Sequence, residues 1–141
     1  MKKLFVFAAL MIALSYAVCA QNATLIPLAA GDTISTSSSK DTVNKVIRVT
    51  AGYSAMGIQV VTTKVSGTVV GKAYLYSSLD GTNYTLTDSS SAFANQTTNT
   101  AFFTKTTTPY TYYKVQVREA DGASNTQSNI VRVYYVLRKH D

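Results

Sequence analysis

The chain has 141 residues, a formal net charge of +6, one histidine and one cysteine. The histidine, His140, is the penultimate residue, so a catalytic triad or a histidine-based metal site has no support. The cysteine, Cys19, lies within the first 20 residues, which excludes disulfide and thiol chemistry from the remainder of the chain.

Residues 1–20 have the three parts of a secretory signal peptide. Lys2 and Lys3 give a positive start, residues 4–14 form an unbroken apolar run, and small residues lead to Ala20. We therefore expect a signal-peptide helix, cleavage after Ala20, and a secreted, periplasmic or cell-surface protein. The apolar stretch ends near Val18, short of the ~20 residues that a membrane helix needs. No membrane span is expected after the signal is removed.

A bacterial lipoprotein signal is the alternative interpretation of the same segment. In such signals a lipid is attached to a cysteine that follows a Leu-x-[Gly/Ala] sequence. Here Tyr16-Ala17-Val18 precedes Cys19, so the leucine and the small residue are both missing. Simple secretion is therefore preferred over attachment through Cys19.

Residues 21–141 have the length of a single domain and repeat strand-like segments between turn residues. Thr, Val and Tyr, which favour strands, are abundant, and no helical period appears. Expected strands cover 23–28, 43–50, 56–65, 68–77, 83–87, 101–105, 110–119 and 129–138. This pattern predicts an all-β fold, an antiparallel β-sandwich of about 7–9 strands, Ig-like or jelly-roll-like.

The segments between these strands carry their own expectations. Residues 32–40 read as a loop or weak edge strand, and residues 88–100 as a long, mobile polar loop. Phe93 is expected to pin that loop to the core. Gly71, in the middle of a strand, predicts a bulge or a close backbone approach.

Asp80-Gly81 stands between two strand-like runs and predicts a hairpin turn, because Gly accepts positive φ and Asp caps the turn. Tyr84 is then expected opposite Tyr76 or Tyr74, as a cross-strand aromatic pair. The phrase Ser-x-Asp-Gly-x-x-Tyr resembles a hairpin of discoidin-like carbohydrate-binding modules and hairpins in small β-sandwich proteins of phage virions. That resemblance implies a ligand-contacting turn, with Asp80 and Tyr84 as contacts. The alternative is a purely structural turn.

The two C-terminal strands alternate apolar and polar residues. If they pair through the loop at 120–128, one outer face gathers basic residues around an aromatic ring. Such a face could hold sulfated or phosphorylated glycan or nucleic acid, or it is simply solvated and protects an edge strand. We prefer the solvated interpretation and expect no nucleic acid. The residues of this face are Lys114, Gln116, Arg118, Arg132, Tyr134 and Arg138.

The segment from Ser66 to Arg138 also resembles Ig-like or fibronectin-III-like sandwiches of bacterial secreted proteins and phage virion proteins. Such domains often end in a tyrosine-rich strand, a loop and a closing strand, as 110–119 and 129–138 do here. The cysteines and tryptophan of true Ig domains are missing. The resemblance implies a sandwich and leaves the function open.

These features predict a protein that is not an enzyme and needs no cofactor. We expect a secreted structural or adhesion module that acts by self-association or by binding another protein at a cell or virion surface. A carbohydrate-binding module for surface glycans is the first alternative. A phage virion component, in capsid decoration or in the tail, is the second.

Overall fold

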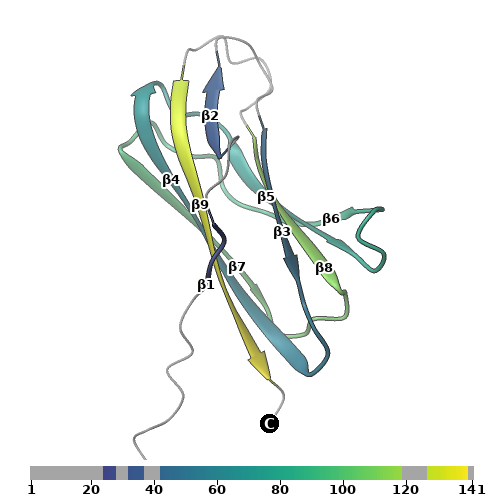
Figure 1. Cartoon of the computed structure of the whole chain (residues 1–141). Coiled ribbons are helices and arrows are strands. Elements are labelled where there is room, and N and C mark those ends of the chain that lie inside the picture. The colour runs from purple at the N-terminus through teal and green to yellow at the C-terminus, as the bar shows by residue number, and fades with distance from the viewer. Residues whose placement is uncertain (1–23, 28–31, 37–41, 119–126, 140–141) are drawn as a thin grey trace, which may run out of the picture.

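The structure, a computed structural model, describes residues 24–27, 32–36, 42–118 and 127–139 (Figure 1). These residues form nine strands and no helix. The predicted all-β fold and strand number are therefore confirmed, whereas the signal peptide expected at 1–20 lies outside the described residues. The strands are β1 (Thr24–Leu25), β2 (Thr33–Thr36), β3 (Thr42–Arg48), β4 (Tyr53–Gly67), β5 (Lys72–Ser78), β6 (Thr85–Ser89), β7 (Thr98–Lys105), β8 (Tyr112–Arg118) and β9 (Gln127–Lys139).

The strands form two antiparallel sheets that lie as two layers (Figure 1). Sheet A has the order β1-β9-β4-β7, with β2 also paired to β9, and sheet B has the order β3-β8-β5-β6. The pairs β5–β6, β4–β7, β3–β8 and β2–β9 are nested, since each pair encloses the previous one in the sequence. The chain thus resembles one long hairpin that is folded over on itself.

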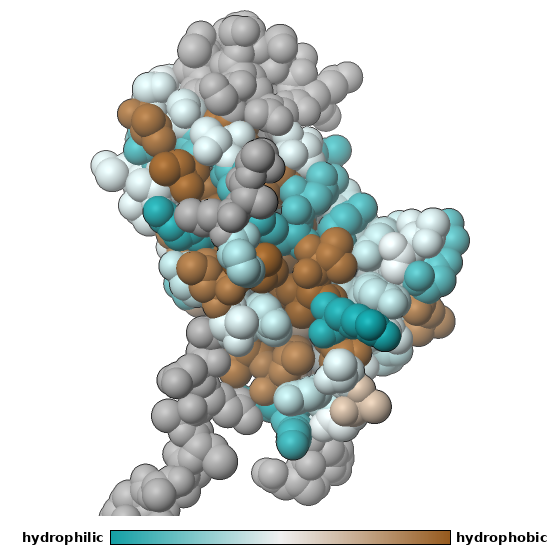
Figure 2. Space-filling model, in the orientation of Figure 1, coloured by the Kyte–Doolittle hydropathy of each residue, from teal (hydrophilic) through white to brown (hydrophobic). Residues whose placement is uncertain are grey.

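The core lies between the two sheets and follows from the two-residue period of the strands. In β8, Tyr113, Val115 and Val117 are buried, and the residues between them face outward. Figure 2 views the sandwich from its side and shows hydrophobic side chains between the layers, flanked by polar ones. The most deeply buried large side chains come from both sheets: Ile47, Met56, Ile58, Val60, Leu75, Tyr113, Val115, Val117, Val131 and Val133.

Residues 33–36 form a short strand that pairs with β9 at the edge of sheet A, in agreement with the weak edge strand that was one of the two interpretations of this segment. Other expected boundaries are wrong. The strand expected at 68–77 begins at Lys72. The polar loop expected at 88–100 is shorter, since β6 extends to Ser89 and β7 begins at Thr98. Asp88 and Ser89 find backbone partners in β5, and residues 98–100 find them in β4, which local composition does not reveal.

The two C-terminal strands do not pair with each other, and this expectation is also wrong. β8 lies in sheet B between β3 and β5, and β9 lies in sheet A between β4 and the two N-terminal strands. The two strands therefore belong to different sheets. The basic face that their pairing predicted does not exist as one surface.

Gly71 and Phe93 are joined by a backbone hydrogen bond. Gly71 has φ of 131°, and its carbonyl accepts a hydrogen bond from the Phe93 N–H at 2.8 Å. The Phe93 ring is half-buried and packs against the core. The close approach at Gly71 and the anchoring role of Phe93 are therefore confirmed.

Candidate functional site

The outer side of sheet B carries alternating tyrosines and cations, and we call this surface the sheet-B face. β8 supplies its centre, because the buried residues of β8 leave the alternate side chains pointing outward. β3 and β5 flank β8 on either side and add one further row each. The face consists of Asn44, Arg48, Tyr74, Tyr76, Tyr112, Lys114, Gln116 and Arg118, with Tyr84 from the β5–β6 loop.

Lys114 lies between two aromatic rings. Its Nζ is 4.4 Å from the ring centroid of Tyr84 and 5.0 Å from that of Tyr76. An ammonium over a ring face is attracted by the ring quadrupole, so the two tyrosines fix the position of this charge. Desolvation, followed by the charges of Tyr112 and Asp80, raises the pKa of Tyr84. Its phenol is therefore neutral at physiological pH and available as a hydrogen-bond donor.

The same arrangement recurs along the face. The Arg118 guanidinium carbon lies 4.4 Å from the Tyr74 ring centroid, and that of Arg48 lies 5.8 Å from the Tyr112 ring centroid. Guanidinium groups stack well on aromatic rings. Lys114, Arg118 and Arg48 thus each rest on at least one tyrosine.

A chain of side-chain hydrogen bonds joins the three strands at the centre of the face. The Tyr76 hydroxyl donates to Gln116 Oε1 at 3.2 Å, and Gln116 Nε2 donates to Asn44 Oδ1 at 3.0 Å. These bonds restrict the rotamers of the groups between the cations. These side chains at the centre of the face are therefore held in one arrangement.

The Asp80 carboxylate makes the hydrogen bonds that hold its own turn. Asp80 Oδ1 accepts hydrogen bonds from the Ser78 hydroxyl and from the backbone N–H groups of Thr82 and Asn83, at 2.7 to 2.8 Å. Asp80 Oδ2 accepts one from Asn83 Nδ2 at 2.7 Å. These bonds, with that from the Asn83 N–H the largest cause, hold the pKa of Asp80 well below its usual range.

The turn supports the sheet-B face from one end. Gly81 has φ of 75°, and a Cβ at this position would lie 3.2 Å from the Tyr112 ring. The loop thus closes tightly onto that ring. The expectation that Tyr84 lies opposite Tyr76 or Tyr74 is wrong, because Leu86 and Ser89 occupy those register positions. Its ring still reaches the face, through Lys114.

The structure separates the residues predicted as contacts. Four of them lie together on or beside the sheet-B face: Tyr84, Asp80, Lys114 and Arg118. The other three belong to β9 in sheet A and are Arg132, Tyr134 and Arg138. On that opposite outer surface, Tyr134 lines a hollow of about 200 Å³ with Gly57 and Phe102.

Sequence reasoning missed five of the nine residues that define the sheet-B face, although their strands show the same two-residue period. The missed residues are Asn44, Arg48, Tyr74, Tyr76 and Tyr112. The missing information was the pairing of β8 with β3 and β5. A pattern of alternation identifies which side chains point outward, but it does not identify which strands are neighbours.

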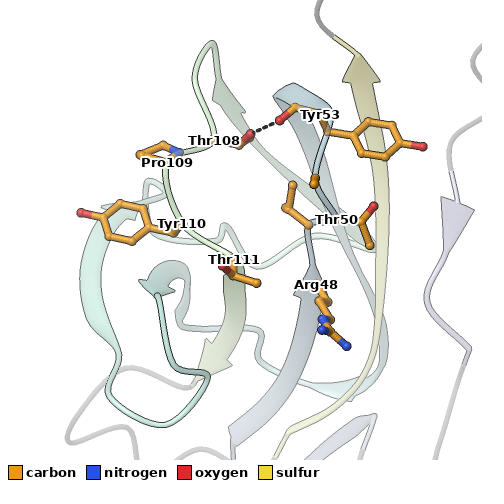
Figure 3. Close-up of a pocket in the computed structure, with 9 residues that line it drawn as sticks. Arg48, Thr50, Tyr53, Thr108, Pro109, Tyr110 and Thr111 are labelled. Atoms are coloured by element: carbon orange, nitrogen blue, oxygen red, sulfur yellow. Dashed lines mark hydrogen bonds between the residues drawn. The ribbon is translucent and has the colours of Figure 1, made fainter.

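A cavity of about 430 Å³ opens at the end of the sandwich between the β3–β4 and β7–β8 loops (Figure 3). Thr108 Oγ1 donates to the Tyr53 carbonyl at 2.7 Å and ties the two loops together. Arg48 is the only charged residue in the lining, so the cavity has no acid–base pair. Through Arg48 and Tyr112 the cavity adjoins the sheet-B face.

Metal sites and membrane helices are not found in the described part of the chain. Residues 24–27, 32–36, 42–118 and 127–139 contain no group of three or more His, Cys, Asp or Glu side chains able to hold a metal ion. Within the same ranges, no helix has the length and apolar character to cross a membrane. No protein-family model matches the chain, and no curated protein is significantly similar to it.

Proposed function

We propose that this protein is a non-catalytic adhesion or structural module that binds a partner with an acidic surface through the sheet-B face. The placement of Lys114 between Tyr76 and Tyr84 carries the proposal. Cations fixed on neutral rings offer charge, hydrogen bonds and apolar area together, which is the composition of binding hot spots. A surface protein at a cell or virion is the partner class we favour.

The carboxylates of the described residues support a non-catalytic role. Asp32 pairs with Lys45, Asp88 pairs with Lys105 at 3.2 Å, and Asp80 is occupied by its turn. General acid–base catalysis needs a group that is free to exchange a proton with substrate. These three carboxylates have structural partners instead.

The location we propose follows from residues 1–20, which have the pattern of a secretory signal peptide. The module would act outside the cytoplasm as a soluble secreted or periplasmic domain, with attachment through Cys19 as the less favoured form. A place on a virion surface is the alternative.

The nested strand pairs favour the jelly-roll form of the sandwich over the Ig-like form. In the Ig-like form the first two strands are neighbours in one sheet.

A matched pair of charge variants tests the proposal. Retention of the purified protein on immobilised poly-glutamate should fall strongly in the double variant Lys114→Met and Arg118→Met. The control, Arg132→Met and Arg138→Met, removes the same charge from the opposite outer surface and should keep most of the retention. Equal losses in the two variants would show that net charge alone is responsible and would overturn the proposal.

A carbohydrate-binding module is the second candidate, favoured by the tyrosine rings beside Lys114 and Arg118. Aromatic rings present flat apolar surfaces with a polar tip, and the cations would complement sulfate or carboxylate groups. Retention on heparin but not on poly-glutamate, with loss in Tyr84→Ala, is the expected result for this candidate. Retention on heparin unaffected by Tyr84→Ala would count against it.

A further inference from the structure

β7 is an edge strand of sheet A and pairs regularly with its one described neighbour, β4. It pairs with β4 from Met56–Lys105 to Thr63–Thr98 without a register shift, and no other described strand pairs with its far side. The opposite edge of the sheet is different, because β1 and β2 cover β9 there. Exposed edges of this kind are templates for pairing with another chain.

The backbone groups on the free side of β7 can be assigned from one hydrogen bond. The Lys64 N–H donates to the Thr97 carbonyl at 2.8 Å, so odd-numbered residues from Thr97 onward direct their backbone groups toward β4. Even-numbered residues therefore direct theirs away from the sheet. The Gln96 side chain already donates to the Thr98 carbonyl at 2.8 Å, which closes one end of the edge.

The remaining open stretch runs from Thr100 to Thr104 and is centred on Phe102. A hollow of about 390 Å³ lies between the β6–β7 loop and this part of β7, so the loop leaves room beside the strand. Phe102 is 69% exposed, the highest value among the large hydrophobic residues of the described chain. Residues 98–104 carry no charge, so nothing in this stretch repels an identical strand.

The neighbouring edge strand of sheet B is protected in the usual ways. β6 is short and has a register irregularity opposite Leu75 and Tyr76. It also carries Asp88, whose carboxylate binds Lys105 at the end of β7. Bulges and charges on an edge discourage pairing, and the centre of β7 has neither.

We propose that β7 pairs with β7 of a second copy of this chain, antiparallel about a two-fold axis at Phe102. In that register Thr100 lies opposite Thr104 of the second copy, and the two Phe102 side chains are direct neighbours on the outer surface of sheet A. An isologous contact of this kind closes as a dimer. The two A sheets would become one continuous sheet, independent of the sheet-B face and of the function proposed for it.

A cysteine trap tests the register. In a Cys19→Ser background, Phe102→Cys should form an intermolecular disulfide on mild oxidation, because residues of a hydrogen-bonded antiparallel pair have Cα atoms about 5.5 Å apart. The control is Leu86→Cys, on the protected edge of sheet B, where the native side chain is 51% exposed. It should remain reduced under the same conditions. Equal cross-linking at the two positions would overturn the proposed register.

Sedimentation of the full chain and its variants tests the contact itself. The parent protein should show a concentration-dependent dimer, which Thr100→Pro and Phe102→Lys should each abolish while their thermal transitions stay close to that of the parent. The Thr100 N–H points away from β4, so proline there removes no hydrogen bond between β7 and β4. A strict monomer, or a dimer that persists in Thr100→Pro, would overturn the proposal. Retention of Thr100→Pro on poly-glutamate reports separately on the sheet-B face.

Discussion

Lys45 and Asp32 form a buried ion pair that connects the two sheets. Lys45 lies on the inward side of β3 in sheet B, and Asp32 directly precedes β2 in sheet A. Both residues are less than 10% exposed. Lys45 Nζ also donates to the Pro27 carbonyl at 3.1 Å. One ammonium thus holds both parts of the described N-terminal segment against the sandwich.

Breaking this pair should destabilise the protein strongly. Asp32→Ala leaves a buried ammonium without its counter-charge, which typically costs about 3–5 kcal/mol. The double variant Asp32→Leu and Lys45→Met removes both charges and should recover most of that loss. Urea unfolding followed by circular dichroism measures both values. A double variant as unstable as Asp32→Ala would contradict the ion-pair explanation.

Asp80 should make stability depend on pH in the acidic range. Because its folded-state pKa is lowered below the unfolded value of about 3.9, its contribution is present above about pH 4 and is lost as pH falls. Asp80→Asn should therefore melt at a lower temperature than the parent at neutral pH, and the gap should narrow in acid. Thr82→Ala, which keeps the N–H that Asp80 binds, is the control. A gap independent of pH would refute this account.

Gly81 and Gly52 form a matched pair for separating backbone strain from a steric clash. Both have positive φ, but a Cβ at Gly52 meets nothing within 4 Å, whereas one at Gly81 meets the Tyr112 ring. Gly52→Ala should cost about 1–2 kcal/mol from the backbone alone. Gly81→Ala should cost more, and the additional loss should shrink in a Tyr112→Ala background. Equal costs at the two glycines would show that the ring yields freely.

Phe93 should stabilise the β6–β7 connection through the core. Its ring packs against the buried cluster, so Phe93→Ala should lower the free energy of unfolding by about 2–4 kcal/mol. Leu79→Ala is the matched control, because Leu79 is 67% exposed and its truncation should change stability by less than about 0.5 kcal/mol. Similar effects of the two substitutions would contradict an anchoring role for Phe93.

Local patterns predicted where the strands of this protein lie better than they predicted which strands pair with each other. The alternation in 110–119 and 129–138 places Val115 and Val133 correctly in the core. The two-residue period of β3 likewise places Lys45 in the same row as Val43 and Ile47, and Lys45 is buried with them. Local turn chemistry was equally informative, since the Asp80 carboxylate makes the capping bonds that the Asp-Gly sequence suggested.

The order of the strands depends on contacts that no local pattern specifies. β8 and β9 are consecutive in sequence, yet each pairs with strands from much earlier in the chain. The two-residue period is the same whichever partner a strand takes. For that reason the cations of β8 and β9 were predicted on one surface. The tyrosines that actually neighbour Lys114, which are Tyr76 and Tyr84, were missed.

The nested order of the strand pairs also has a kinetic consequence. The β5–β6 hairpin is the only local pair of the four, and the Asp80 turn closes it with bonds made inside the loop. Each later pair must close a longer loop, and β2 with β9 must close the longest. Closure entropy rises with loop length and slows folding. Folding that starts at Asp80 and ends with the docking of β2 would leave the Lys45–Asp32 pair among the last contacts to form.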